Sequence, residues 1–326
     1  MTMGASAPVA AIERGRIMSQ EVVKEQFVTA TTKSGVQIRY EDSTHRYWVR
    51  SNDAEEWIEC DYSMSGVADC LAKGGLTWWG MKIGLQAVVT LIERGYIRVS
   101  IDGKIVVMGE NAWELPTMEN LLFRTQEQKI TVNQIRDKAG DRGNSVHKAL
   151  ETWVESAALP VPDFYPEEER GYVRGLLAFL GDLGELKSKP QSEIMVGSVE
   201  HRVAGRYDLE AVLQGARLVT KKATPSWTGQ PGDHHSAKGP EYTEFKGRTL
   251  FDLKTSKDVY LSHKLQMTGY EGCRIECGMP KTEQQLVVVV NDDGTYKAVP
   301  ADTTWEEFLL CLEMARISDA KGGRTK

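Results

Sequence analysis

Two short segments of the chain carry carboxylates at a spacing that suits hydrolytic chemistry. Asp208 ends a Gly-Arg-Tyr-Asp run, and Asp252 is separated from Lys254 by one apolar residue, Leu253. Side chains two positions apart on a strand point to the same face, so Asp252 and Lys254 should share one pocket. Hard divalent cations prefer carboxylate and carbonyl oxygens, and a lysine beside them can orient an attacking water. We therefore expect Asp208, Asp252 and the Leu253 carbonyl to bind Mg²⁺ or Mn²⁺, with Lys254 assisting phosphodiester hydrolysis.

Two helical segments place further polar side chains at the same site. His147 and Glu151 are four positions apart and so lie on one helical face, which makes His147 a candidate metal ligand. Gln266 and Tyr270 have the same spacing in the helix that follows the Asp-x-Lys strand. We expect these two side chains to bind substrate phosphate or to orient Lys254.

Two further positions are weaker candidates. Glu193 and Glu200 precede Asp208, and their odd separation puts them on opposite strand faces, so only one should reach the site. We favour Glu193 as an additional metal ligand. Arg142, just before His147, is a candidate for contacting DNA, although a charge at a helix start is more often part of a solvated face.

The hydrophobic pattern predicts an α/β fold, with a central mixed sheet flanked by helices. Strand patterns occur at 193–199, 201–213, 249–253, 285–291 and 295–300, after hairpins at 36–49 and 97–108. Helical patterns occur at 63–71, 77–94, 118–126, 132–138, 141–157, 167–186, 262–277 and 305–317.

Composition along the chain suggests its organisation. We predict a loosely held leader at 1–34, an N-terminal accessory layer at 35–139, a core at 140–317 and a frayed tail at 318–326. Residues 215–247 are rich in Lys, Gly, Pro, Ser and His, and we predict an inserted loop there.

The ordered motifs make the pattern more specific. Gly-Asn-Ser-Val-His ending at His147, Gly-Arg-Tyr-Asp ending at Asp208, Asp-Leu-Lys-Thr-Ser-Lys starting at Asp252 and Gln-Met-Thr-Gly-Tyr starting at Gln266 resemble those of the RecB-type branch of the PD-(D/E)XK nuclease superfamily. The resemblance covers about 141–290 and is strongest to exonuclease-like proteins of bacteriophages. More weakly, His-Arg-Tyr-Trp at 45–48 and residues 63–73 resemble their N-terminal portion.

The resemblance implies a restriction-endonuclease-like core and a function. The His, the two Asp and the Lys would be catalytic or metal-binding, and the Gln and Tyr would support substrate binding. It implies a metal-dependent deoxyribonuclease, an exonuclease rather than an endonuclease, acting in phage or bacterial DNA recombination or repair. A recombinase, a single-strand annealing protein or a helicase would be a natural partner.

Some relatives hold an iron-sulfur cluster with one N-terminal cysteine and three closely spaced C-terminal ones. This chain has no such C-terminal trio, and Cys273 and Cys277 come too soon after Tyr270. We therefore expect no iron-sulfur cluster. The five cysteines fit a reducing cytoplasm, and no apolar stretch is long enough to span a membrane, so we expect a cytoplasmic protein without a membrane partner.

The formal net charge of -6 argues against non-specific electrostatic binding of nucleic acid by the whole surface of the protein. The DNA contact would then depend on a local basic groove or on the metal. The main alternative is a DNA-binding recombination accessory protein with an inactive nuclease fold, although a dead site has no physical need for two carboxylates beside a lysine. A metallopeptidase based on the His147 helix lacks a second histidine at the required offset.

Overall fold

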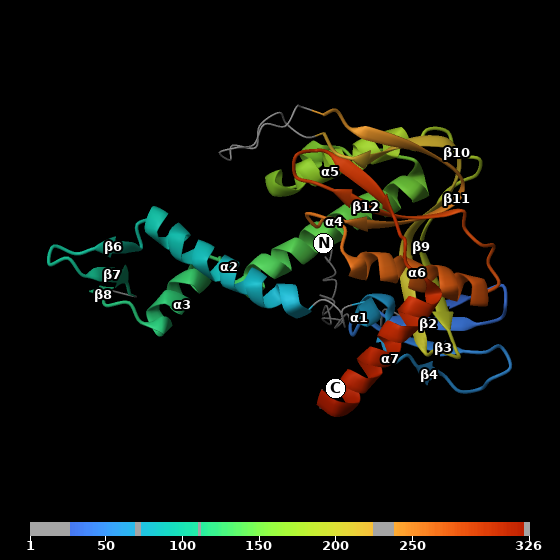
Figure 1. Ribbon diagram of the computed structural model, residues 1–326, viewed down its shortest axis with the longest axis horizontal. Coiled ribbons are helices and arrows are strands. Elements are labelled where there is room, and N and C mark those ends of the chain that lie inside the picture. The colour runs from blue at the N-terminus through green and yellow to red at the C-terminus, as the bar shows by residue number, and fades with distance from the viewer. Residues whose placement is uncertain (1–26, 69–72, 110–111, 224–237, 323–326) are drawn as a thin grey trace, which may run out of the picture.

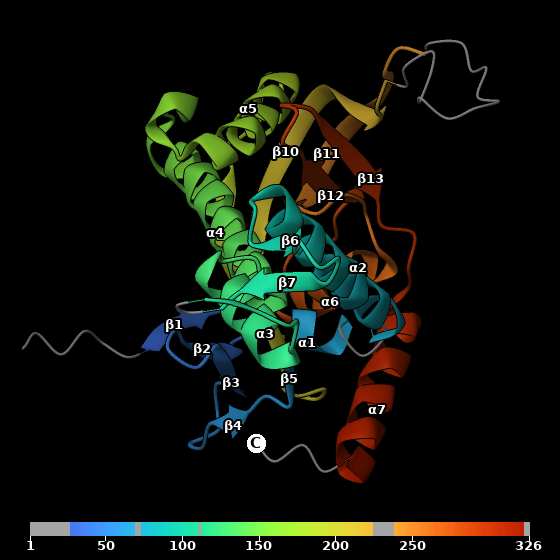
Figure 2. The ribbon, with the colours of Figure 1, turned by 90° about the vertical axis from the view of Figure 1, so that its left-hand side faces the viewer.

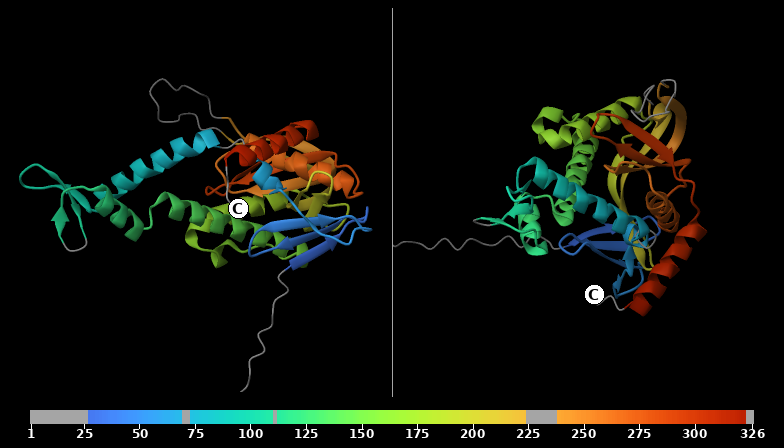
Figure 3. Two further views of the ribbon diagram at one scale, coloured as in Figure 1. Left: turned by 90° about the horizontal axis from the view of Figure 1, so that it is seen from below. Right: turned by 60° about the vertical axis from the view of Figure 1, so that its left-hand side comes forward.

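The computed structural model describes residues 27–68, 73–109, 112–223 and 238–322. The protein is an α/β structure in which a curled mixed sheet is flanked by helices (Figure 1). A helical arm extends from one side of this body, as two further views also show (Figure 3).

The central sheet has six strands and carries the Asp-x-Lys motif in its middle. Its order is β13-β12-β11-β10-β5, and β9 pairs with β10. The β11/β12 and β10/β5 pairs are parallel, and the other pairs are antiparallel. The strands are β5 (Tyr62–Ser63), β9 (Gln191–Ser198), β10 (Val203–Lys221), β11 (Glu241–Lys254), β12 (Gln284–Val290) and β13 (Tyr296–Pro300).

One face of the sheet is covered by α4 (Val132–Ser156), which packs on β9 and β10, and by α5 (Glu167–Asp182), which packs on β10, β12 and β13 (Figure 2). Leu150 of α4 and Phe179 of α5 are buried with Phe251 and Leu253 of β11. The short 3-10 helix η2 (Pro162–Phe164) connects the two helices. A capping box between Thr131 and Gln134 starts α4, and the left-handed Ala157 follows its end.

The other face is covered by α6 (Leu261–Glu276), α7 (Trp305–Gly322) and α1 (Met64–Ala68). An antiparallel sheet of β1 (Phe27–Thr31), β2 (Gln37–Glu41), β3 (Arg46–Arg50) and β4 (Ile58–Glu59) packs beside β9 and β10. Met64, Val203 and Phe308 share this second core. The central strand β12 is buried on both faces from Leu286 to Val290, as expected for a strand between two helical layers.

The arm consists of α2 (Lys73–Glu93), a small sheet and α3 (Met118–Glu127). Its sheet contains β6 (Ile97–Val99), β7 (Ile105–Met108) and β8 (Trp113–Glu114). Leu91 and Val107 form its own small core. The predicted accessory region 35–139 is therefore found in two places, because β2–β5 and α1 pack against the body whereas α2–α3 project from it.

Several predicted boundaries are wrong. Residues 27–31 of the predicted leader form β1, because each of them pairs with β2. The two predicted helices at 132–138 and 141–157 are one helix, α4, which crosses the predicted boundary at 139/140 without a break at Gly140. Residues 318–322 of the predicted tail continue α7.

The predicted loop at 215–247 is also too long. Its first and last parts belong to β10 and β11, which pair as a long antiparallel hairpin from Ala216 to Lys221. Because many residues of these strand ends are exposed and polar, the sequence lacks the alternation of apolar and polar residues that indicates a strand. The middle of the predicted loop, 224–237, and the predicted leader up to residue 26 lie outside the described residues.

Within the described residues, no helix is long and apolar enough to cross a lipid bilayer.

Candidate functional site

A polar cavity of about 380 Å³ lies where β9, β10 and β11 meet α4 and α6. It brings together eight of the predicted positions, which lie far apart in the sequence. They are His147, Glu151, Glu193, Asp208, Asp252, Lys254 and the pair Gln266 and Tyr270 on one helix.

The end of β11 places Asp252 and Lys254 on one face of the sheet. Phe251 and Leu253 point to the opposite face and are buried in the core beneath α4 and α5. The Lys254 Nζ atom lies 2.5 Å from Oδ2 of Asp252, whose side chain is almost fully buried. Among the described residues, no hydrogen bond reaches this Oδ2 besides the ion pair. Burial raises the pKa of Asp252 to about 6, although the Lys254 ammonium opposes this effect.

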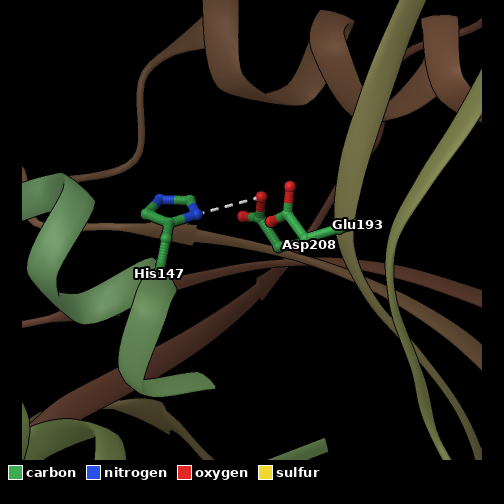
Figure 4. Close-up of side chains that lie close together, drawn as sticks. All are labelled: His147, Glu193 and Asp208. Carbon is green, nitrogen blue, oxygen red and sulfur yellow. Dashed lines mark ion pairs between the residues drawn. The ribbon is translucent and has the colours of Figure 1, made fainter. Parts of the chain in front are cut away.

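Asp208 is fixed by contacts to two other elements. Its Oδ2 accepts a hydrogen bond of 2.5 Å from the backbone N–H of Leu253, and its Oδ1 lies 3.1 Å from Nδ1 of His147 (Figure 4). Burial alone would raise the pKa of Asp208, but the His147 imidazole and the Lys254 ammonium hold this pKa below its usual range. Since the N–H and C=O of one strand residue point to the same side, the Leu253 carbonyl is directed toward the edge of β11 that faces Asp208.

His147 reaches the site from α4. Burial lowers the pKa of its imidazole, but the facing Asp208 carboxylate outweighs this effect and raises the pKa overall. The same helix is anchored to the core by Val146 and Leu150, so the orientation of His147 is set by packing on both sides of it. Glu151 lines the cavity one turn later and pairs with Lys148 at 2.6 Å.

Glu193 enters the cavity through an irregular backbone. The β9/β10 pairing ends at Ile194 and Tyr207, so Glu193 stands beside Asp208, one position past the last pair. Its φ of 57° lies in the left-handed region, where a residue other than glycine is uncommon. Glu193 forms an ion pair with Arg206, and burial raises the pKa of its carboxyl against the effect of this arginine. Glu200 is exposed in the turn after β9, so the choice of Glu193 over Glu200 is confirmed.

One group of side chains is arranged so that it could hold a cation. His147, Glu193 and Asp208 each offer a ligand atom, and these three atoms lie within 4.8 Å of one another (Figure 4). An imidazole nitrogen with two carboxylates suits Mg²⁺ less than a set made of oxygen alone, but suits Mn²⁺ well. Asp252 lines the same cavity but is not part of this group, and its carboxylate is paired with Lys254.

The helix α6 supplies the remaining predicted pair. The side-chain amide of Gln266 donates a hydrogen bond of 2.7 Å to the Tyr270 hydroxyl, and both residues line the cavity. Tyr270 is buried, which raises its pKa well above the ordinary value, so it stays a neutral phenol.

Arg142 does not line the cavity. Its Nη2 donates to the backbone carbonyl of Thr255 at 3.4 Å, and its guanidinium lies 4.4 Å from the centre of the Tyr172 ring. These contacts hold α4 against the segment that follows Lys254. In this structure Arg142 therefore supports the site and does not face it.

Several lining residues were not predicted. Arg206 and Asn144 belong to the motifs that were recognised, but neither was assigned a role. Tyr47 of β3 and three residues of the β5–α1 segment also line the cavity, namely Ser63, Met64 and Ser65. The only signal for them was the weak resemblance of the N-terminal segments. The N-terminal sheet therefore forms a wall of the site as well as a layer beside the core.

No known protein-family model matches the chain, and no curated protein matches it significantly. The fold and site therefore define an α/β protein that has two buried carboxylates, a histidine and a lysine in one cavity beside two inner strands of its central sheet.

Proposed function

We propose that this protein is a metal-dependent deoxyribonuclease of the PD-(D/E)XK type. The observation that carries the proposal is the convergence in one cavity of a possible cation site, His147, Glu193 and Asp208, with the Asp252–Lys254 pair. Neither half alone would support phosphodiester hydrolysis. Together they offer ligands for a cation and a positive side chain beside it.

The residues present fit a hard divalent cation such as Mn²⁺ or Mg²⁺. Besides the three clustered ligands, the buried Oδ2 of Asp252 takes no hydrogen bond among the described residues, so this oxygen is available to a second positive charge. When bound, the cation would neutralise charge on the scissile phosphate and lower the pKa of the attacking water. Asp208, Asp252 and the Leu253 carbonyl are our proposed ligands, with His147 and Glu193 completing the set.

The chain's own groups would then orient the reactants. The Lys254 ammonium, held by Asp252 at the cavity wall, can donate a hydrogen bond to the attacking water or to a phosphate oxygen. The Tyr270 hydroxyl accepts from Gln266 and so has its own proton free to donate to a phosphate oxygen. Arg206 also lines the cavity, and its guanidinium would attract a phosphate next to the scissile one.

An exonuclease of phage or bacterial recombination or repair is the activity that we favour, with DNA as substrate and a recombinase, annealing protein or helicase as partner. This preference rests on the resemblance of the motifs alone. The second candidate is a DNA-binding accessory protein with an inactive site. Because buried carboxylates without a function are costly, the retained pair of Asp208 and Asp252 favours the enzyme.

The test is a cleavage assay on labelled linear and circular duplex and single-stranded DNA, with Mg²⁺, with Mn²⁺ and with a chelator. We expect the wild type to degrade linear DNA only with metal, and Asp252→Asn to lose this activity. Cleavage of circular DNA would indicate an endonuclease. Binding of DNA without cleavage under any metal would favour the accessory protein.

A further inference from the structure

The arm exposes an apolar surface that its own fold does not cover. On α2, Leu91 lies in the small core of the arm and Ala87 is buried, whereas Met81, Leu85, Val88, Val89 and Ile92 are between 38% and 63% exposed. On α3, Met118 is 73% exposed and Leu122 is 56% exposed. We call these seven exposed residues the arm face.

The arm face borders a groove. A hollow of about 890 Å³ runs between α2 and α3 and ends at the start of α4. Met81, Leu85 and Val88 line it from one side, and Met118 and Leu122 from the other. A ridge of apolar side chains beside an apolar groove is the arrangement that accepts an amphipathic helix.

The size of the arm face is that of an interface. Its exposed fractions correspond to roughly 700 Å² of accessible surface, which exceeds the roughly 300–600 Å² of the largest apolar patch on a typical monomer. It is close to the roughly 800 Å² that each partner buries in a standard interface. A surface of this size without a partner would favour aggregation.

The spacing of the apolar residues on α2 is self-complementary. Met81, Leu85, Val88 and Ile92 follow one another at alternating intervals of four and three, which is the seam of a two-helix contact. This order of intervals is the same when the helix is read backwards. Two antiparallel copies of α2 therefore pair Met81 with Ile92 of the second copy, and Leu85 with Val88 of the second copy.

The charges of α2 select the same arrangement. Lys82 and Glu93 are the only charged residues among the described side chains of this helix, both are exposed, and neither makes an ion pair within the described residues. They are separated by about three helical turns and so lie on the same flank of the seam. In an antiparallel pair the same flanks of the two helices meet, so each Lys82 faces the Glu93 of the other copy, whereas a parallel pair would place the two charged flanks on opposite sides of the seam.

We propose that the arm face is a dimer interface, in which the α2 helices of two copies of this chain pack antiparallel and enter each other's groove. The inference does not depend on the proposed nuclease activity. It assigns the arm a role that the core alone does not explain, since the arm contributes no residue to the polar cavity.

The test is the molar mass of the full chain, measured by sedimentation velocity across a concentration series. We expect a species of about 73 kDa, twice the 36.4 kDa of one chain. Leu85→Glu should shift the protein to the monomer, because it buries a charge in the seam. The matched control is Ile105→Glu, an equally exposed apolar residue of β7 outside the groove, which should leave the dimer intact. Circular dichroism verifies that both variants are folded.

The charge variants test the antiparallel geometry and alter only exposed residues. Lys82→Glu should raise the dissociation constant of the dimer about tenfold, because two symmetry-related contacts become repulsive. The double variant Lys82→Glu/Glu93→Lys should restore it. A wild type that stays monomeric at every concentration overturns the proposal and leaves the face to a different protein. A dimer that survives both Leu85→Glu and Lys82→Glu overturns it as well, because such a dimer uses another surface.

Discussion

The Asp208 carboxylate accepts a hydrogen bond of 2.5 Å from the backbone N–H of Leu253. This bond joins β10 to β11 where their ladder has ended, since the last paired residues are Leu209 and Phe251. It therefore holds the Gly-Arg-Tyr-Asp motif that ends at Asp208 against the Asp-Leu-Lys motif that contains Leu253. The same carboxylate contacts His147, so three segments of the chain meet on one side chain.

Two substitutions of Asp208 should separate its contribution to stability, through the hydrogen bond from Leu253, from its role in the proposed chemistry. Asp208→Asn keeps an acceptor for the Leu253 N–H, so we expect a change in the free energy of unfolding of less than about 1 kcal/mol. Asp208→Ala leaves this buried N–H without a partner and should cost about 1–3 kcal/mol. Urea denaturation measures both. Equal stability of the two variants would contradict the claim that the hydrogen bond from the Leu253 N–H stabilises the fold.

Cation binding should depend on Glu193 and not on Glu200. Glu193→Gln removes one of the three clustered ligands, and we expect at least a tenfold weaker affinity for Mn²⁺, or about 1.4 kcal/mol. Glu200→Gln is the matched control, because Glu200 is exposed in the turn after the same strand. Titration of Mn²⁺ monitored by electron paramagnetic resonance gives the affinities. If Glu193→Gln binds as tightly as the control, this cation site is wrong.

Arg274 is the centre of a buried charge network on the same face of the sheet. Its guanidinium is 1% exposed and pairs with Glu210 at 2.6 Å and Glu271 at 2.9 Å. Arg274→Met would leave these acids buried without their main partner, so we expect a loss of stability of about 3–5 kcal/mol. Arg46→Met, which breaks an exposed pair with Glu59, should cost less than about 1 kcal/mol. Similar losses in the two variants would show that the network is not what stabilises this face.

How far the sequence predicts the site can be judged from particular residues. Period-two spacing placed Asp252 and Lys254 on one face, and period 3.6 placed Gln266 beside Tyr270, because both pairs lie within regular elements. Glu193 could not be placed by parity, since its left-handed backbone interrupts the alternation of β9. The wall formed by Tyr47 depends on how a separate sheet packs on the core, and local patterns carry no such information.

The fold shows the same division. Buried strands such as β12 were found because their apolar run is continuous. The ends of β10 and β11 were missed because a hairpin that projects beyond the core is polar on exposed faces, and its pairing comes from the partner strand. The helix α4 was predicted as two helices, 132–138 and 141–157, whereas the capping box at Thr131 and Gln134 starts one helix that continues through Gly140.

Stability at acid pH should depend on His263. Burial, together with the nearby Lys254 ammonium, lowers the pKa of this imidazole from 6.5 to about 4. The unfolded chain therefore binds the proton more readily, so this group lowers stability as the pH falls from about 6.5 toward about 4, and has no effect above that window. His263→Gln removes this effect.

The measurement is the free energy of unfolding of the wild type and His263→Gln at about pH 8 and about pH 5. The variant should gain stability relative to the wild type at the lower pH. A difference between the two proteins that does not change with pH would contradict the assignment.

The central claim is that Lys254 takes part in metal-dependent cleavage of DNA. It is tested most directly by the rate at which linear DNA is degraded with Mn²⁺ by Lys254→Met and by Lys246→Met. Lys246 lies on the same strand, is 65% exposed and pairs with Glu244, so its replacement removes an equal charge away from the cavity. We predict that Lys254→Met loses at least a hundredfold in rate, or about 2.7 kcal/mol of transition-state stabilisation, while Lys246→Met keeps the wild-type rate. Equal rates for the wild type and Lys254→Met would contradict the account.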